Sequence, residues 1–226
     1  MNKIYQFTII LVLICNVGII NAQQTSNHLT PVKGGFEVND SQFEYHSRVR
    51  NVLFNGLTEL PEVRFLVIPS FTPENVLIID YDRNIDKYYL IYHICEQNIW
   101  YNPKWEEVKI NKYRKEIDHK SVKLIKSLFD IATSQVKYAD MNKIIYPDGS
   151  MKVVVGVDGT NYFFSVFLNE LGMRSGAVWS PDKGSKMDKL VKIGESLVTL
   201  TKSEKERVSI DTELQKSIEN LVNELK

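Results

Sequence analysis

The chain has 226 residues, of which 43% are hydrophobic and 25% are charged. Its 28 basic side chains balance its 28 acidic side chains, so it has no broad positive field to attract nucleic acid or an anionic membrane. These properties are typical of a globular protein with one sizeable core, and they exclude binding of nucleic acid through bulk charge.

Residues 1–22 have the features of a secretory signal peptide. They include a basic residue, Lys3, then an apolar stretch over residues 7–15, and they end with the small residue Ala22. This stretch is short for a membrane span, which needs about 20 apolar residues, so we expect cleavage after Ala22 rather than a retained anchor. The protein is therefore predicted to be exported, as a periplasmic or secreted protein without a stable membrane span.

The exported chain is predicted to be one disulfide-free domain with a segment attached at each end. Cleavage removes Cys15 and leaves Cys95 as the only cysteine, so the stability has to come from packing in the core. Residues 23–40 are poor in large apolar groups and are predicted to be a flexible lead-in. Residues 41–202 are predicted to form the globular domain, and residues 203–226 a C-terminal amphipathic helical extension.

The first half of the domain is predicted to contain a helix followed by a group of strands. Ser41 and Glu44 form a capping-box pattern, and apolar residues then recur at helical spacing until Gly56. Short β-rich runs follow at residues 63–68, 76–81, 87–96 and 108–115. The last of these runs is rich in charge, which is typical of an exposed edge strand.

The second half is predicted to contain three helices. A long apolar stripe indicates a helix over residues 118–138, with Asp118 as its N-cap. Two further helices are predicted, one beginning near Ser185 and one over residues 212–225. Runs of strands separated by helices indicate an α+β fold. We expect one mainly antiparallel sheet, built from two strand meanders and covered by three or four helices.

Two turn signals predict hairpins between these helices. Residues 146–149 read Tyr-Pro-Asp-Gly, which is typical of a turn. Asp158 and Gly159 predict a two-residue hairpin in which Val157 opposes Thr160 and Val153 opposes Phe164. Apolar residues occupy both faces of this hairpin, so we expect it to lie centrally in the sheet, between helices.

The first candidate binding site is the aromatic loop over residues 97–105. Trp100, Tyr101 and Trp105 are rigid, amphipathic groups, suited to stacking on a sugar or anchoring a protein partner. Alternatively, Trp100 and Trp105 fold back over the edge of the sheet and fill a small additional core.

The second candidate is the segment that leads into the helix near Ser185. It contains Arg174, Trp179 and Asp182, and a helix N-terminus beside Arg174 could hold an anionic group. Its spacing is not that of a phosphate-binding loop. Alternatively, the segment is a structural connection in which Ser185 caps the helix and Trp179 fills a gap between helix and sheet.

Cys95 is a candidate nucleophile with a nearby base. His93 lies two residues earlier, so the two side chains share one face of a strand, and a Cys–His pair can generate a thiolate. The strand is apolar on both faces, however, which favours a buried and unreactive pair. The remaining histidines show no metal-binding spacing, so neither a metal site nor a cofactor is predicted.

The C-terminal helix carries an apolar stripe made of Leu214, Ile218, Leu221 and Leu225. This spacing fits a short coiled-coil seam, which could pair with a second copy to form a homodimer. It fits equally well the docking of the helix on its own domain.

Together these patterns predict an exported, non-catalytic binding or interaction protein of the cell envelope or exterior, with a protein or saccharide as its partner. The predicted binding residues are Trp100, Trp105, Arg174, Trp179 and Asp182. The alternative is an exported hydrolase that uses scattered acidic residues or the pair of His93 and Cys95.

Overall fold

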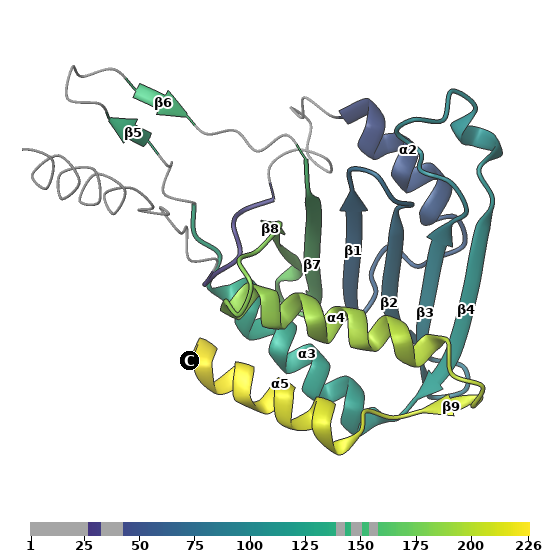
Figure 1. Cartoon of the computed structure of the whole chain (residues 1–226). Coiled ribbons are helices and arrows are strands. Elements are labelled where there is room, and N and C mark those ends of the chain that lie inside the picture. The colour runs from purple at the N-terminus through teal and green to yellow at the C-terminus, as the bar shows by residue number, and fades with distance from the viewer. Residues whose placement is uncertain (1–26, 33–42, 139–142, 146–150, 154–157) are drawn as a thin grey trace, which may run out of the picture.

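A mainly antiparallel sheet forms the centre of the molecule (Figure 1). The structure, a computed structural model, describes residues 27–32, 43–138, 143–145, 151–153 and 158–226. Within them, seven strands form one sheet in the order β8-β7-β1-β2-β3-β4-β9. Every neighbouring pair is antiparallel except β4 and β9, which are parallel. The predicted α+β fold is therefore confirmed.

Four of these strands form the first meander. They are β1 (Val63–Pro69), β2 (Asn75–Asp82), β3 (Lys87–Cys95) and β4 (Ile110–Ile117). All four were predicted, and their bounds differ from the predicted ones by no more than two residues. A two-residue strand, β9 (Arg207–Val208), pairs only with the end of β4. Most of β4 therefore lies at the sheet edge, where its charged side chains suit contact with water.

The second group is β7 (Thr160–Leu168) and β8 (Gly172–Trp179), and its pairing corrects the predicted hairpin. Phe164 lies opposite Phe65 of β1 rather than Val153, and Thr160 lies opposite Pro69. Val153 instead pairs with Lys143, in the separate hairpin of β5 (Lys143–Ile145) and β6 (Met151–Val153).

The prediction of this pairing was wrong because the partner of a long apolar strand is selected by the burial of its two faces in the whole fold. The residues of a local turn do not reveal a partner that is distant in the chain. Strand β7 is an inner strand of the main sheet, between β1 and β8, whereas β6, the other arm of the predicted hairpin, belongs to the separate two-stranded sheet, so the hairpin as a whole is not central. Residues 146–149 and 154–157, which include the other predicted turn and Val157, lie outside the described residues.

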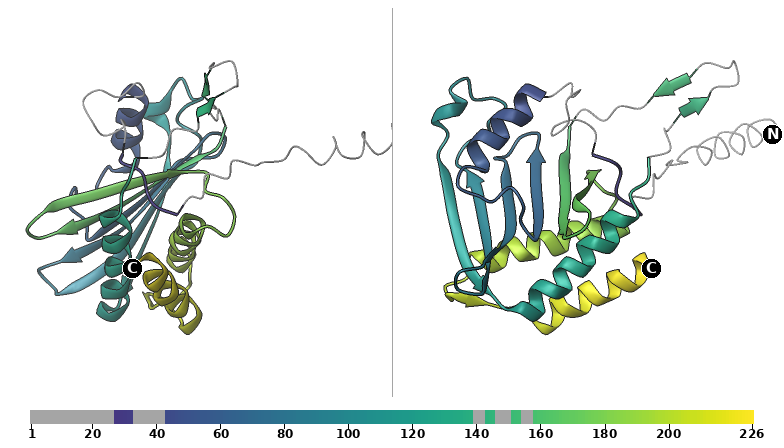
Figure 2. Two further views of the ribbon diagram at one scale, coloured as in Figure 1. Left: turned by 90° about the vertical axis from the view of Figure 1, so that its left-hand side faces the viewer. Right: turned by 180° about the vertical axis from the view of Figure 1, so that it is seen from behind.

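Helices cover both faces of the sheet (Figure 2). One face carries α2 (Phe43–Leu53), and the other carries α3 (His119–Ser134) and α4 (Lys186–Thr201). The fourth helix, α5 (Thr212–Leu225), packs against α3 and α4 from outside. No helix in the described part of the chain is long and apolar enough to cross a membrane.

Side-chain caps fix where three of these helices begin. The carboxylate of Asp118 accepts a hydrogen bond from the backbone N–H of Ser121, as predicted, at the start of α3. The hydroxyl of Ser185 does the same for Asp188 at the start of α4. Asp211 caps α5 in the same way. The predicted capping residue Ser41, before α2, lies outside the described residues.

The sheet separates two apolar cores. The larger core lies under α3, α4 and α5 and contains the buried rings of Phe65, Phe129 and Phe164. The smaller core lies under α2 and contains Leu53, Ile78 and other buried residues of β1 and β2. Successive residues of a strand point to opposite faces, so β1 and β2 contribute to both cores.

The apolar stripe of α5 faces its own domain. Ile218, Leu221 and Leu225 are buried and belong to the larger core. The side chain of Gln135, just after α3, donates a hydrogen bond to the backbone carbonyl of Leu225. The stripe therefore already has a partner within the chain.

Candidate functional site

The loop between β3 and the short helix η1 (Trp105–Glu107) projects two aromatic side chains into solvent. Asn98 shapes the loop, because its amide donates to the carbonyl of Thr72 at 2.8 Å and accepts from the N–H of Tyr101 at 3.2 Å. Ile99 is fully buried in the smaller core. The neighbouring Trp100 and Tyr101 are consequently left 51% and 60% exposed.

A buried carboxylate, Glu74, ties this loop to α2. The hydroxyl of Tyr45 donates to one of its oxygens at 2.7 Å. The N–H of Ile99 is shared between both oxygens, at 3.1 and 2.9 Å. Burial and the nearby Glu74 carboxylate raise the pKa of Tyr45, so its phenol remains a donor. A buried carboxylate needs such donors, and here they fix the positions of two separate segments.

These two segments and the end of the sheet enclose a small cavity, which we call the aromatic cleft. Its volume is about 190 Å³, and it is lined by Tyr45, Ile68, Pro69, Ser70, Trp100, Tyr101, Asp158 and Asn161. The rings of Tyr45 and Trp100 meet edge to face, with their centroids 4.8 Å apart and their planes at 90°. The two rings thus form two walls at a right angle.

The aromatic cleft also contains uncommitted polar groups. Asp158 and Asn161 make no side-chain hydrogen bond or ion pair within the described part of the chain. The hydroxyl of Ser70, in contrast, is already used, because it donates to the carbonyl of Gly159 at 2.8 Å and accepts from its N–H at 3.0 Å. A carboxylate and an amide are therefore left to bind a ligand, beside two aromatic rings.

Trp179 lies next to the aromatic cleft but does not line it. In the sheet register Ile68 is opposite Asn161, and Asn161 is opposite Trp179, so the three lie in one row on the α2 face. The indole is 45% exposed and covers Gly159, where a Cβ would lie 2.7 Å from its Nε1. The structure thus brings Trp100 and Trp179, predicted from separate segments, to the same end of the same face.

Trp105 and Arg174 lie elsewhere. Trp105 is partly buried against the smaller core, with the guanidinium of Arg48 5.7 Å from the centre of its ring. Arg174 is on the opposite face of the sheet, since its register partner Val166 belongs to the core under α3. It forms an ion pair with Asp130 and donates to the hydroxyl of Thr133 at 3.1 Å. Arg174 therefore connects β8 to α3.

Asp182 lies in the connection between β8 and α4. Its backbone carbonyl accepts a hydrogen bond of 3.0 Å from the N–H of Ser185, the N-cap of α4. Of the five predicted binding residues, the structure therefore brings together Trp100 and Trp179, and it places Arg174 on the other face.

His93 and Cys95 are both buried on the α2 face of β3. The imidazole Nδ1 of His93 lies 2.8 Å from the carbonyl of Leu53, and burial lowers the pKa of this histidine. Burial also raises the pKa of the Cys95 thiol to about 12. Both surroundings favour the neutral side chain, whereas nucleophilic catalysis needs a thiolate.

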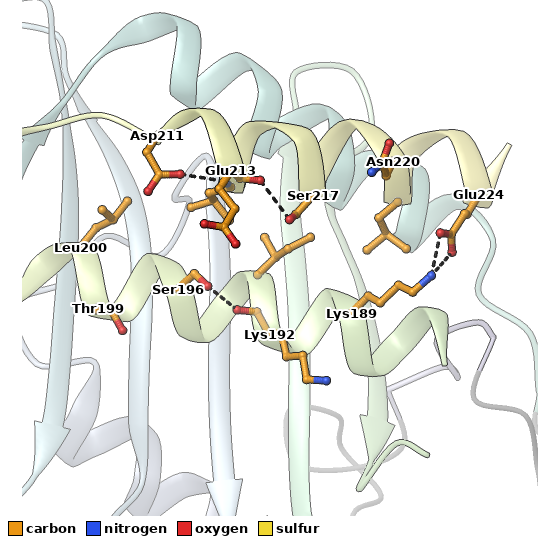
Figure 3. A pocket seen from close by; sticks show the side chains of 13 residues that line it. Lys189, Lys192, Ser196, Thr199, Leu200, Asp211, Glu213, Ser217, Asn220 and Glu224 are labelled. Carbon is orange, nitrogen blue, oxygen red and sulfur yellow. Dashed lines mark hydrogen bonds and ion pairs between the residues drawn. The ribbon is translucent and has the colours of Figure 1, made fainter. Parts of the chain in front are cut away.

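A groove larger than the aromatic cleft lies on the outer surface between α4 and α5 (Figure 3). Its volume is about 590 Å³, and charges of both signs surround an apolar floor that includes Leu200 and Leu214. Lys189 forms an ion pair with Glu224 at one end of the groove, and the hydroxyl of Ser217 donates to the carbonyl of Glu213. Most of the polar side chains that line the groove have partners of this kind, whereas the side chains of Glu213 and Asn220 make no hydrogen bond or ion pair within the described residues.

Sequence patterns indicated only part of the aromatic cleft. Trp100 was predicted as a binding residue, but Tyr45, Asp158 and Asn161 were not. Asp158 was interpreted as a turn residue, and Asn161 and Tyr45 belong to elements whose contact no local pattern reveals. No group of three or more His, Cys, Asp or Glu side chains suited to a metal ion occurs among the described residues.

Comparisons of the chain with protein-family models, with curated proteins and with solved structures give no match.

Proposed function

We propose that the protein is an exported, non-catalytic binding protein of the cell envelope or exterior, and that the aromatic cleft holds its ligand. The observation that carries this proposal is the half-exposed indole of Trp100, fixed edge to face against Tyr45 beside two uncommitted polar side chains. Ligand sites commonly combine apolar walls with a few converging polar groups. Buried aromatic anchors also dominate the binding energy of protein interfaces.

The chemistry of the aromatic cleft favours binding over catalysis. Asp158 is the one carboxylate among the described residues that line it. Enzymes that hydrolyse glycosidic bonds normally use two carboxylates. The other acid nearby, Glu74, is buried and engaged by Tyr45 and Ile99. The buried pair of His93 and Cys95 supplies no competing nucleophile, so no observation favours the hydrolase alternative.

Export is part of this proposal and rests on residues 1–22, which lie outside the described residues. Fractionation of cells that produce the full chain should place it outside the cytoplasm. Sequencing of the mature protein should give an N-terminus at Gln23. A protein that keeps its first residues and remains in the cytoplasm would contradict the proposal.

The binding site can be tested through the tryptophans, because the chain has only three. Protein labelled with 5-fluorotryptophan should give three ¹⁹F NMR signals, each assigned by a Trp-to-Phe variant. We expect envelope extract from the producing organism to shift the signal of Trp100 and to leave that of the partly buried Trp105 unchanged. An extract that leaves the signal of Trp100 unchanged would overturn the proposal.

A further inference from the structure

We infer that the ligand of the aromatic cleft is an uncharged saccharide, of which one sugar ring is held between Trp100, Tyr45 and the Asp158–Asn161 side. This inference rests on the proposed function, since it names the class of ligand for the same site. Three features of the cleft carry it: its charge, its polar atoms and its rigidity.

The charge of the cleft argues against an anionic ligand. Among the described residues that line it there is no Lys or Arg, and Asp158 is the one that carries a charge. An acidic sugar, a phosphate or an acidic peptide would therefore meet repulsion and no counter-charge.

The polar atoms of the cleft distinguish a saccharide from a cation. Asp158 supplies two acceptor oxygens, and Asn161 supplies both a donor and an acceptor. Sugar hydroxyls both donate and accept, so they can use all of these groups. A cationic ammonium group, primary or quaternary, accepts no hydrogen bond, so it would leave the amide donor of Asn161 without an acceptor.

The volume and the rigidity of the cleft fit a small, rigid ligand. About 190 Å³ is below the range of about 300–1,000 Å³ for drug-sized ligands, which suits a single sugar ring. Both aromatic walls are anchored before a ligand arrives, because Glu74 holds Tyr45 directly and holds Trp100 through Ile99. Preorganised walls reduce the entropy that binding would otherwise lose.

The test uses the mature full chain and defined probes, read by the ¹⁹F signal of Trp100 and by calorimetry. The probes are neutral gluco-, manno- and galacto-oligosaccharides, oligogalacturonate and tetramethylammonium chloride. We expect saturable binding of at least one neutral series and a shift of the Trp100 signal. Trp100→Ala should weaken that binding by about tenfold or more, and so should Asp158→Ala.

Trp179→Ala is the matched control. It removes an indole of similar exposure from the same face, outside the lining of the cleft, and should change the affinity by less than about twofold. Circular dichroism checks that each variant folds. Binding that is lost equally in Trp179→Ala would overturn the assignment to the cleft.

The outcomes separate this inference from the proposed function. If only tetramethylammonium or oligogalacturonate shifts the Trp100 signal, the inference is wrong and binding at the cleft stands. If no neutral series binds while envelope extract still shifts Trp100, the inference is again wrong and the proposed function stands. If neither the probes nor the extract acts at Trp100, both are overturned.

Discussion

At the scale of single residues, Glu74 shows how one buried side chain positions a surface. Its carboxylate forms no ion pair with a described residue and accepts hydrogen bonds from Tyr45 of α2 and from Ile99 of the aromatic loop. A buried charge is stable only when such donors satisfy it. The need to satisfy Glu74 therefore fixes the distance between α2 and the loop, and with it the width of the aromatic cleft.

Cys95 gives the first prediction, a dependence of stability on alkaline pH. The folded protein raises the pKa of this thiol from 9.0 to about 12. Between these values the unfolded chain loses the proton that the folded chain keeps, so stability present below pH 9 should fall as pH rises. The loss approaches about 1.4 kcal/mol per pH unit, measured by urea unfolding between pH 8 and 11.

Cys95→Ala is the control for this prediction. Burial also raises the pKa of Tyr92 to about 12, so tyrosines contribute to the alkaline dependence in both proteins. The difference between the wild-type and Cys95→Ala plots of unfolding free energy against pH gives the contribution of the thiol alone. The native thiol should also resist alkylation near neutral pH and react after denaturation. If the two proteins lose stability equally as pH rises, and if Cys95 of the folded protein is alkylated rapidly, then Cys95 is exposed and ionisable and the prediction is wrong.

At the scale of elements, helix α4 approaches the sheet through Gly194. A Cβ at this position would lie 2.6 Å from Cε1 of Phe65, whose ring is fully buried. Glycine in a helix interior normally costs about 1 kcal/mol relative to alanine. Here the close approach of the phenyl ring explains its presence, because any side chain would push α4 away from β1.

Gly194→Ala is therefore predicted to destabilise the protein by about 1–3 kcal/mol, although alanine favours helices. The measurement is the free energy of unfolding from urea denaturation. Ser196→Ala, an exposed position in the same helix, is the matched control and should change stability by less than about 0.5 kcal/mol. A stabilised Gly194→Ala variant would mean that α4 lies farther from Phe65.

Elements with a local signal were predictable from the sequence. The caps at Asp118 and Ser185 and the apolar stripe of the last helix indicated helix starts that the structure confirms. The pairing of Phe164 was not predictable in this way. Its partner, Phe65, is about a hundred residues away in the chain, and its selection depends on the burial of two strand faces.

At the scale of the whole molecule, α5 completes the larger core instead of extending away from it. Leu221 is 1% exposed, in a core that also contains residues of the sheet, α3 and α4. Lys189 and Glu224 add an ion pair between α4 and α5. A helix of 14 residues is marginal in isolation, so its order depends on this contact.

Leu221→Ala should therefore lower the free energy of unfolding of the whole domain by about 2–5 kcal/mol. Asn220→Ala, at the neighbouring exposed position, should change it by less than about 0.5 kcal/mol. Unfolding followed by circular dichroism and by tryptophan fluorescence should remain one coincident transition. Separate melting of α5, with the main transition unchanged, would show that residues 203–226 behave as an independent extension.

The candidate site was only partly predictable at this scale. The loop pattern identified Trp100 but left open whether its indole folds back over the sheet or faces solvent, and the structure leaves it 51% exposed. Tyr45 and Asn161 join it only because α2 and the end of β7 converge there. Arg174 was predicted to lie beside the helix N-terminus near Ser185, where an anionic group could bind, but alternation along β8 places it on the opposite face from Trp100, paired with Asp130.

Local sequence patterns specify the α+β class, the starts of α3, α4 and α5 and the bounds of the four strands of the first meander, because caps, turns and apolar periodicity act over a few residues. Only the tertiary structure decided which strands pair, which face each tryptophan occupies and which polar groups meet beside Trp100. Those outcomes depend on the joint burial of surfaces far apart in the chain, and a linear pattern does not specify how such surfaces are matched.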